Sequence, residues 1–161
     1  MSDLNTNAKK YIEGFTLLEV VIVVSILGLL AALGLLGVRN AQTKVSVERA
    51  QAELEVIASA VLELAWDTGH YPNQKPRNIN SSVERWDVSE NAAGLLGSDG
   101  NFPNWDGPYL DEVPLDPWGN KYFFDPDYKV DGVMRAVVGS FGPNGVGRNQ
   151  YDADDVYVII K

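Results

Sequence analysis

The sequence predicts an α+β fold in which one long N-terminal helix packs on a small antiparallel β-sheet. An unbroken apolar block covers residues 15–38, helical periodicity continues to about residue 67, and short β-type runs occur from residue 122 onward. A chain of 161 residues is long enough for one compact domain, so the helix and the sheet are expected to share one core. When one layer of helix packs on one layer of sheet, both elements bury their apolar faces in that core.

The apolar block has the length of a membrane-spanning helix. Besides glycines, the only polar residues among the 24 residues 15–38 are Thr16, Glu19 and Ser25. At about 1.5 Å per residue such a helix is roughly 36 Å long, which exceeds the ~30 Å hydrocarbon core of a bilayer. We therefore expect residues 15–38 to form a transmembrane helix.

A polar leader, residues 1–14, precedes this block and carries Lys9 and Lys10 near its end. These basic residues favour a leader that stays in the cytoplasm. A cleavable secretory signal is a competing interpretation, but its apolar region is about 7–15 residues long and its cleavage site lies beyond that region. Here the one sharp junction of a small and a large residue, Gly14-Phe15, lies before the apolar block.

The helical pattern continues beyond the block as one narrow apolar stripe. Apolar residues recur at spacings of three and four at Val47, Ala50, Leu54, Ile57, Val61 and Leu64. Such a stripe is typical of a helix that lies on a hydrophobic core. Gly69 can adopt a left-handed conformation and Pro72 cannot continue a helix, so we expect a single helix from about residue 15 to 67.

The second half of the chain predicts a connection followed by strands. Residues 73–104 are rich in Asn, Ser and Gly, and we expect a variable surface loop with at most a short helix near 89–96. Trp86 and Trp105 are expected to anchor this loop through their apolar area. After a turn signal at Gly119-Asn120, β-type runs follow at 122–124, 134–138 and 156–160.

Composition excludes several classes of function. The chain has 13 Lys+Arg and 22 Asp+Glu, a net charge of -9 and no basic stripe, so nucleic acid is not an expected partner. It has no cysteine, which excludes disulfides and thiolate metal sites. Its single histidine, His70, lies in a turn, and no nucleophile elbow or phosphate-binding glycine loop is present. We therefore do not expect an enzyme.

The N-terminal junction resembles the processing site of type IV prepilins and type II secretion pseudopilins. Residues 14–19 read Gly-Phe-Thr-Leu-Leu-Glu. The resemblance implies a type IV pilin-like fold and a cut after Gly14 by a membrane-embedded aspartyl peptidase, the prepilin peptidase, which also methylates the new N-terminal Phe15. Residues 114–120 and the acidic C-terminal turn are similar, more narrowly, to the major pseudopilins of type II secretion.

Glu19 is the only acidic residue of the apolar block. A charged carboxylate at the centre of a membrane helix costs about 2.5–3.5 kcal/mol, and Glu19 lies near one end, where the cost is lower. One interpretation is that its side chain simply reaches the lipid headgroups. The cleavage site favours a second one: a cut at Gly14 creates a cationic amine on Phe15, with which Glu19 of a neighbouring subunit could pair in an apolar helix bundle.

The C-terminal loop, residues 139–155, contains many oxygen-bearing side chains. Calcium needs about six to eight oxygen ligands, and from the residues alone a solvated acidic turn is the favoured interpretation. The resemblance implies one structural calcium ion here. Carried over by position, its ligands are the side chains of Asn144 and of Asp154 or Asp155 and the Phe141 carbonyl. Ser140 supplies either a hydroxyl ligand or a supporting contact, and Asp152 is a further candidate. The family usually has aspartate where this chain has Asn144.

The resemblance also implies a function and its surroundings. The expected organisation is a leader at 1–14, a transmembrane and polymerisation helix at 15–38 and a periplasmic globular domain at 39–161. The expected function is that of a structural subunit, anchored in the bacterial inner membrane, which forms a helical homopolymer, the periplasmic pseudopilus of a type II secretion system. Expected partners are minor pseudopilins, the inner-membrane assembly platform and the prepilin peptidase. The alternatives are a major or minor pilin of a type IV pilus and, more remotely, a membrane-anchored enzyme.

Overall fold

The computed structural model describes residues 14–77 and 81–161, and the side chains of residues 33–41 are excluded from the description. The chain divides into two compact units, Met1–Ala41 and Gln42–Lys161. Helix α1, Leu17–Thr68, begins in the first unit and ends in the second. The leader predicted at 1–14 lies outside the described residues except for Gly14.

The first unit is the N-terminal part of α1. Among its described side chains, the large apolar ones are exposed, from 48% for Val20 to 83% for Leu17. Among the residues searched, no helix reaches the length and apolarity that a membrane crossing requires. The predicted span, 15–38, includes residues 33–38, whose side chains lie outside the described set.

In the second unit, α1 buries the predicted stripe. Five of its six residues are at most 2% exposed: Ala50, Leu54, Ile57, Val61 and Leu64. Val47 is 38% exposed and does not belong to the core cluster, so the prediction is wrong for this residue. The buried face therefore begins at Ala50, where the rest of the unit first packs over the helix.

Helix α1 ends one residue beyond the predicted position. Gly69 has a φ of 71° and donates its N–H to the carbonyl of Ala65 at 3.1 Å. The buried Thr68 hydroxyl donates to the carbonyl of Leu64, one turn earlier in the helix, at 2.6 Å. Gly69 adopts the left-handed conformation that the sequence predicts for the end of the helix.

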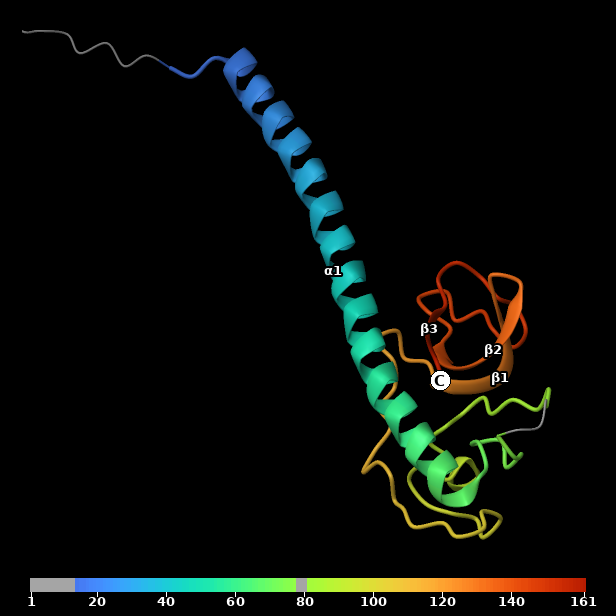
Figure 1. Cartoon of the computed structure of the whole chain (residues 1–161). Coiled ribbons are helices and arrows are strands. Elements are labelled where there is room, and N and C mark those ends of the chain that lie inside the picture. Colours follow the sequence, from blue (N-terminus) through green and yellow to red (C-terminus); the bar gives the residue numbers. More distant parts are fainter. Residues whose placement is uncertain (1–13, 78–80) are drawn as a thin grey trace, which may run out of the picture. The chain divides into compact units, whose positions relative to one another are not determined.

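Three strands form one antiparallel sheet in the order β1-β2-β3 (Figure 1). They are β1, Phe123–Val130, β2, Val133–Ser140, and β3, Val156–Ile159. The first two are longer than predicted because they join at a tight turn, Asp131-Gly132, in which both residues have positive φ. An Asp-Gly pair between strands is a strong hairpin signal, although this hairpin was not predicted above.

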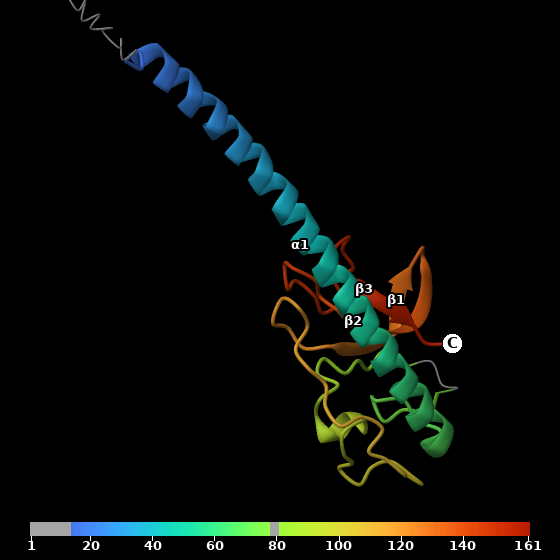
Figure 2. The same ribbon diagram turned by 90° about the vertical axis from the view of Figure 1, so that its left-hand side faces the viewer.

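Side chains that alternate along the strands enter two different clusters. One face of the sheet packs on α1 through Phe124, Val138 and Val156 (Figure 2). The opposite face carries a second cluster around Phe123, Tyr128 and Val137. This alternation follows from the period of two in a β-strand, and it gives a three-stranded sheet apolar cover on both faces.

The connection at 73–104 contains little regular structure. It forms one short 3-10 helix, η1, Asn91–Ala93, in place of the longer helix considered from the sequence. As predicted, the two tryptophans anchor it: Trp86 packs on the second cluster, and Trp105 Nε1 donates to the carbonyl of Gly94 at 2.8 Å. These contacts fix a segment whose own residues provide few apolar runs.

Leu54 provides a test of the contact between α1 and the sheet. Its side chain is fully buried, so Leu54→Ala should lower the free energy of unfolding by about 2–5 kcal/mol through lost burial and a cavity. Val56, on the same helix, is 57% exposed, and Val56→Ala should change the free energy of unfolding by less than about 0.5 kcal/mol. Denaturant unfolding of both variants measures the difference, and equal losses would contradict the assignment of the buried face.

Candidate functional site

The predicted processing junction lies just before α1. Phe15 is 79% exposed, and a side chain added at Gly14 would meet no atom within 4 Å. Both residues precede the first helical residue, Leu17. In the described part of the chain, therefore, nothing covers the Gly14-Phe15 peptide bond.

Glu19 caps the start of α1. Its Oε2 accepts hydrogen bonds from the Thr16 backbone N–H at 3.0 Å and from the Thr16 hydroxyl at 2.9 Å, while the Thr16 hydroxyl accepts from the Glu19 N–H at 3.2 Å. This reciprocal pair is a capping box, which satisfies N–H groups that a helix start leaves free. The spacing Thr16-x-x-Glu19 is the signal for this role in the sequence, and the role was not predicted above.

The C-terminal loop brings together three of the predicted calcium ligands. The Asn144 amide donates to Asp152 Oδ2 at 2.9 Å and to Asp154 Oδ1 at 2.6 Å. Its Oδ1 accepts from the Val146 N–H at 2.6 Å, which fixes the orientation of the amide. Two carboxylates from one end of the loop thus converge on a residue at the other end.

Ser140 has a supporting contact. Its buried hydroxyl donates to Asp116 Oδ2 at 2.5 Å and accepts the N–H of Gly142 at 3.1 Å. Asp116 Oδ1 in turn accepts the N–H of Asn120 at 2.7 Å, and the Asn120 amide donates to the carbonyl of Gly142 at 3.1 Å. The turn before β1 is thereby joined to the start of the C-terminal loop.

The other two predicted residues turn toward the second cluster. The ring of Phe141 stacks on that of Phe123, with centroids 4.5 Å apart. Asp155 Oδ2 accepts the hydroxyl of Tyr128 at 2.6 Å, while its buried Oδ1 has no hydrogen-bond partner among the described residues. The Asp155 carboxyl is therefore only half satisfied.

Electrostatics differ among the three aspartates of the loop. The hydrogen bond from Asn144 holds the pKa of Asp152 below its usual value. The proximity of Asp152 raises the pKa of Asp154, and burial raises that of Asp155. Two of the three carboxylates thus lie where negative charge is disfavoured unless a cation compensates it.

Gly142 allows the two ends of the loop to approach each other. It has a φ of 61°, and a Cβ at this position would lie 2.1 Å from the carbonyl oxygen of Asp154. No other residue type fits such a contact without a shift of the backbone. Carbonyl and carboxylate oxygens are the donors that calcium prefers, so the residues of this loop fit that ion.

A second cluster of acidic side chains lies beside β1, outside the C-terminal loop. Carboxylate oxygens of Glu84, Asp125 and Asp127 lie within 4.8 Å of one another. Burial raises the pKa of Asp125 to about 7. Nothing in the sequence places Glu84 next to Asp125 and Asp127.

Comparison with known protein families assigns most of the chain. The model of the family described as "Type II secretion system (T2SS), protein G" matches residues 37–158. This chain belongs to the type II secretion system protein G family. A second model, the "Prokaryotic N-terminal methylation motif", matches residues 9–35, which include the Gly14-Phe15 junction.

Several relatives are named type II secretion system core protein G. That of Pseudomonas aeruginosa is 33% identical over 112 residues, which cover 68% of this chain and 70% of the relative. That of Escherichia coli K12 is 31% identical over 68% of this chain and 69% of the relative, and that of Klebsiella pneumoniae 28% identical over 87% and 91%.

One solved structure in the comparison is the major pseudopilin from the type 2 secretion system of enterohaemorrhagic Escherichia coli. It matches with a TM-score of 0.48 and 23% sequence identity, over 73% of this chain and 86% of that chain.

Proposed function

We propose that this protein is a structural subunit that polymerises into the periplasmic pseudopilus of a type II secretion system. The observation that carries the proposal is the match of residues 37–158 to the protein G family. The N-terminal methylation motif at 9–35 supports it, because that motif covers the junction at which the subunit would be processed. The prepilin peptidase would cut after Gly14 and methylate Phe15.

The surface of the first unit supports assembly through α1. Large apolar side chains from Phe15 to Leu30 are exposed, and burying them would be strongly favourable. Before assembly, the inner membrane would cover residues 15–38, with the domain at 39–161 in the periplasm. In the filament, the helices of other copies would cover them. Minor pseudopilins and the inner-membrane platform would be further partners.

Glu19 would serve two purposes in this assembly. Within the subunit it caps α1 through Thr16, and both of these hydrogen bonds end on Oε2. The second oxygen, Oε1, can then accept the cationic amine of Phe15 from a neighbouring subunit. Pairing removes two charges that would otherwise be uncompensated in an apolar bundle.

One calcium ion in the C-terminal loop, 139–155, would complete the subunit. Asn144, Asp152 and Asp154 already converge, and the half-satisfied Asp155 offers a further oxygen. Phe141 would contribute its carbonyl, and Ser140 would position the loop through Asp116. Bound calcium supplies positive charge that offsets the repulsion among these carboxylates.

A type IV pilus subunit, major or minor, is the second candidate, because the same N-terminal motif serves both kinds of filament. The family match favours the pseudopilus. Deletion of the gene should abolish exoprotein secretion and leave surface fibres intact, and a plasmid copy should restore secretion. Retained secretion with lost fibres would support the pilus instead.

Glu19 variants separate charge pairing from helix capping. Glu19→Gln keeps a side chain that can cap, whereas Glu19→Ala removes both functions. Both precursors should be cleaved normally, yet neither should assemble, because one unpaired buried charge costs about 3–5 kcal/mol, or more than about 100-fold in association. Shearing assays and mass spectrometry of the mature N-terminus measure assembly and cleavage. Normal filaments from Glu19→Gln would show that only the cap matters.

Calcium binding by the loop predicts a thermal shift. At calcium concentrations of 100 times Kd, the free energy of unfolding should rise by about 2.7 kcal/mol, which raises Tm by roughly 5–10 °C. The double variant Asp154→Ala, Asp155→Ala should lose the part of the calcium shift that the loop provides. Differential scanning calorimetry in calcium and in EDTA measures it, and a wild-type protein without any shift would refute the site.

Asn144→Asp tests the loop with a substitution that should strengthen calcium binding instead of abolishing it. It replaces an amide that donates to two carboxylates by a third carboxylate. In EDTA the variant should therefore melt below the wild type, while in calcium the added charge should tighten binding and enlarge the shift. Equal destabilisation with and without calcium would indicate that the amide itself closes the loop.

A further inference from the structure

The fold brings Glu84, Asp125 and Asp127 together by two features of the backbone. Arg85 pairs with Phe124 in an isolated antiparallel bridge, with N···O distances of 2.8 Å and 2.7 Å, so that Glu84 lies beside β1. Within β1 the register shifts between Asp125 and Tyr128. In this bulge the Asp127 N–H donates to Asp125 Oδ1 at 2.9 Å, which draws the two aspartates toward each other.

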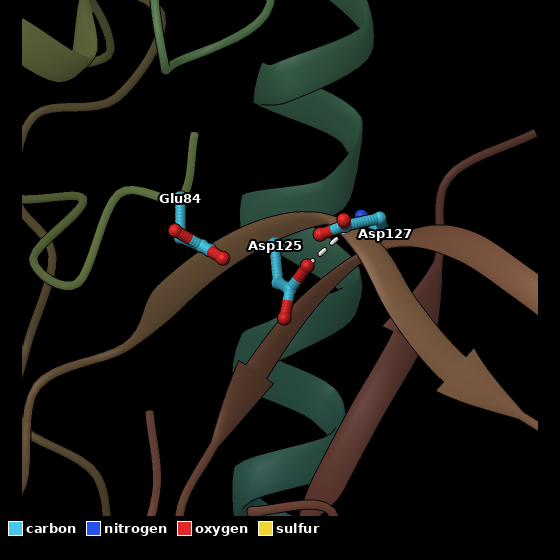
Figure 3. A group of neighbouring side chains, drawn as sticks. All are labelled: Glu84, Asp125 and Asp127. Atoms are coloured by element: carbon cyan, nitrogen blue, oxygen red, sulfur yellow. Dashed lines mark hydrogen bonds between the residues drawn. The ribbon is translucent and has the colours of Figure 1, made fainter. Parts of the chain in front are cut away.

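Asp125 is the centre of this acidic cluster. Figure 3 shows Glu84 and Asp127 on either side of its carboxyl group, and one carboxylate oxygen from each of the three residues lies within 4.8 Å of the others. Asp125 is only 1% exposed. Its Oδ2 and the Oδ1 of Asp127 are buried without a hydrogen-bond partner in the described residues.

Such an arrangement is costly without a positive charge. A buried carboxylate oxygen without a partner loses its hydration, and neighbouring carboxylates repel one another. Within residues 14–77 and 81–161, no Lys or Arg forms an ion pair with any of the three. Two buried carboxylate oxygens without a hydrogen-bond partner, next to a third carboxylate, therefore indicate a site for a cation.

We propose that Glu84, Asp125 and Asp127 form a second cation site, which binds a calcium ion. With Ca–O distances of 2.3–2.6 Å, opposite ligands of one ion lie about 4.6–5.2 Å apart, which accommodates the observed 4.8 Å. A hollow of about 360 Å³, lined in part by Ser81, Ser82 and Asp127, gives room for an entering ion and its remaining water ligands.

This site is separate from the C-terminal loop and does not depend on the proposed function. Glu84 belongs to the connection at 73–104, whereas Asp125 and Asp127 belong to β1. An ion held by all three would tie the connection to the sheet, next to the backbone bridge between Arg85 and Phe124. It would therefore stabilise a connection that has little regular structure of its own.

Ion counting tests the proposal directly. The full-length protein in detergent is freed of metal with EDTA, dialysed and titrated with Ca²⁺ alone in a calorimeter. Asp125→Asn should remove one bound ion per chain, both in the wild type and in the Asp154→Ala, Asp155→Ala background. The second background lacks the loop site, so the result can be interpreted even if the loop binds no calcium. An unchanged ion count in both backgrounds would overturn the proposal.

The direction in which the melting temperature changes provides a second test of the proposal. In EDTA, Asp125→Asn should melt above the wild type, because it removes a repelled buried charge. In calcium, it should lose the part of the shift that this site provides. Glu84→Gln, which changes a half-buried loop residue and leaves the sheet intact, should weaken calcium binding at this site at least about tenfold. Asp131→Asn, an equal change of charge at an exposed turn residue, should leave ion count and affinity unchanged.

If Asp125→Asn instead melts lower than the wild type in EDTA and keeps the full calcium shift, the carboxylate serves only as a structural acceptor for Asp127. That result would also overturn the proposal. A similar loss of calcium affinity in Asp131→Asn would also overturn the proposal, because it would show that the loss follows from the change in net charge alone.

Discussion

The contact between one face of α1 and the sheet is the interaction on which the second unit depends. Leu54 and Val61 on the helix share a core cluster with Tyr122 and Phe124, and all four are fully buried. A polar contact accompanies this apolar one: the Tyr122 hydroxyl donates to Glu53 Oε2 at 2.5 Å. Burial raises the pKa of Tyr122, so the hydroxyl keeps its proton and stays a donor. The helix thereby fixes the point at which β1 begins.

Both acidic sites follow from this placement of β1. On one side, Asp116 and Asn120, in the turn before the strand, hold Ser140 and Gly142 at the start of the C-terminal loop. On the other side, the bulge within β1 gathers Asp125 and Asp127. A small sheet cannot bury many apolar residues, and ions bound at its loops would provide stability that a cysteine-free chain does not obtain from disulfides.

The first unit follows a different constraint. Its large apolar side chains from Phe15 to Leu30 remain exposed in the single chain, so one subunit by itself leaves this hydrophobic surface unburied. In the proposed assembly Glu19 would fit both this state and the filament, because capping occupies one carboxylate oxygen and leaves the other for a partner. The residue that makes the helix costly in an apolar environment is also the residue that starts it.

The sequence alone determined the features that depend on local periodicity and motif. The stripe from Ala50 to Leu64 and the end of α1 near Gly69 could be predicted because helical spacing and left-handed glycine are local properties. The family resemblance likewise rested on contiguous residues at 14–19. Only the tertiary structure decided that Val47 lies outside the core, because the exposure of a helix face depends on what packs against it. The same holds for Glu84, which is distant from Asp125 in sequence and meets it only through backbone pairing beside β1.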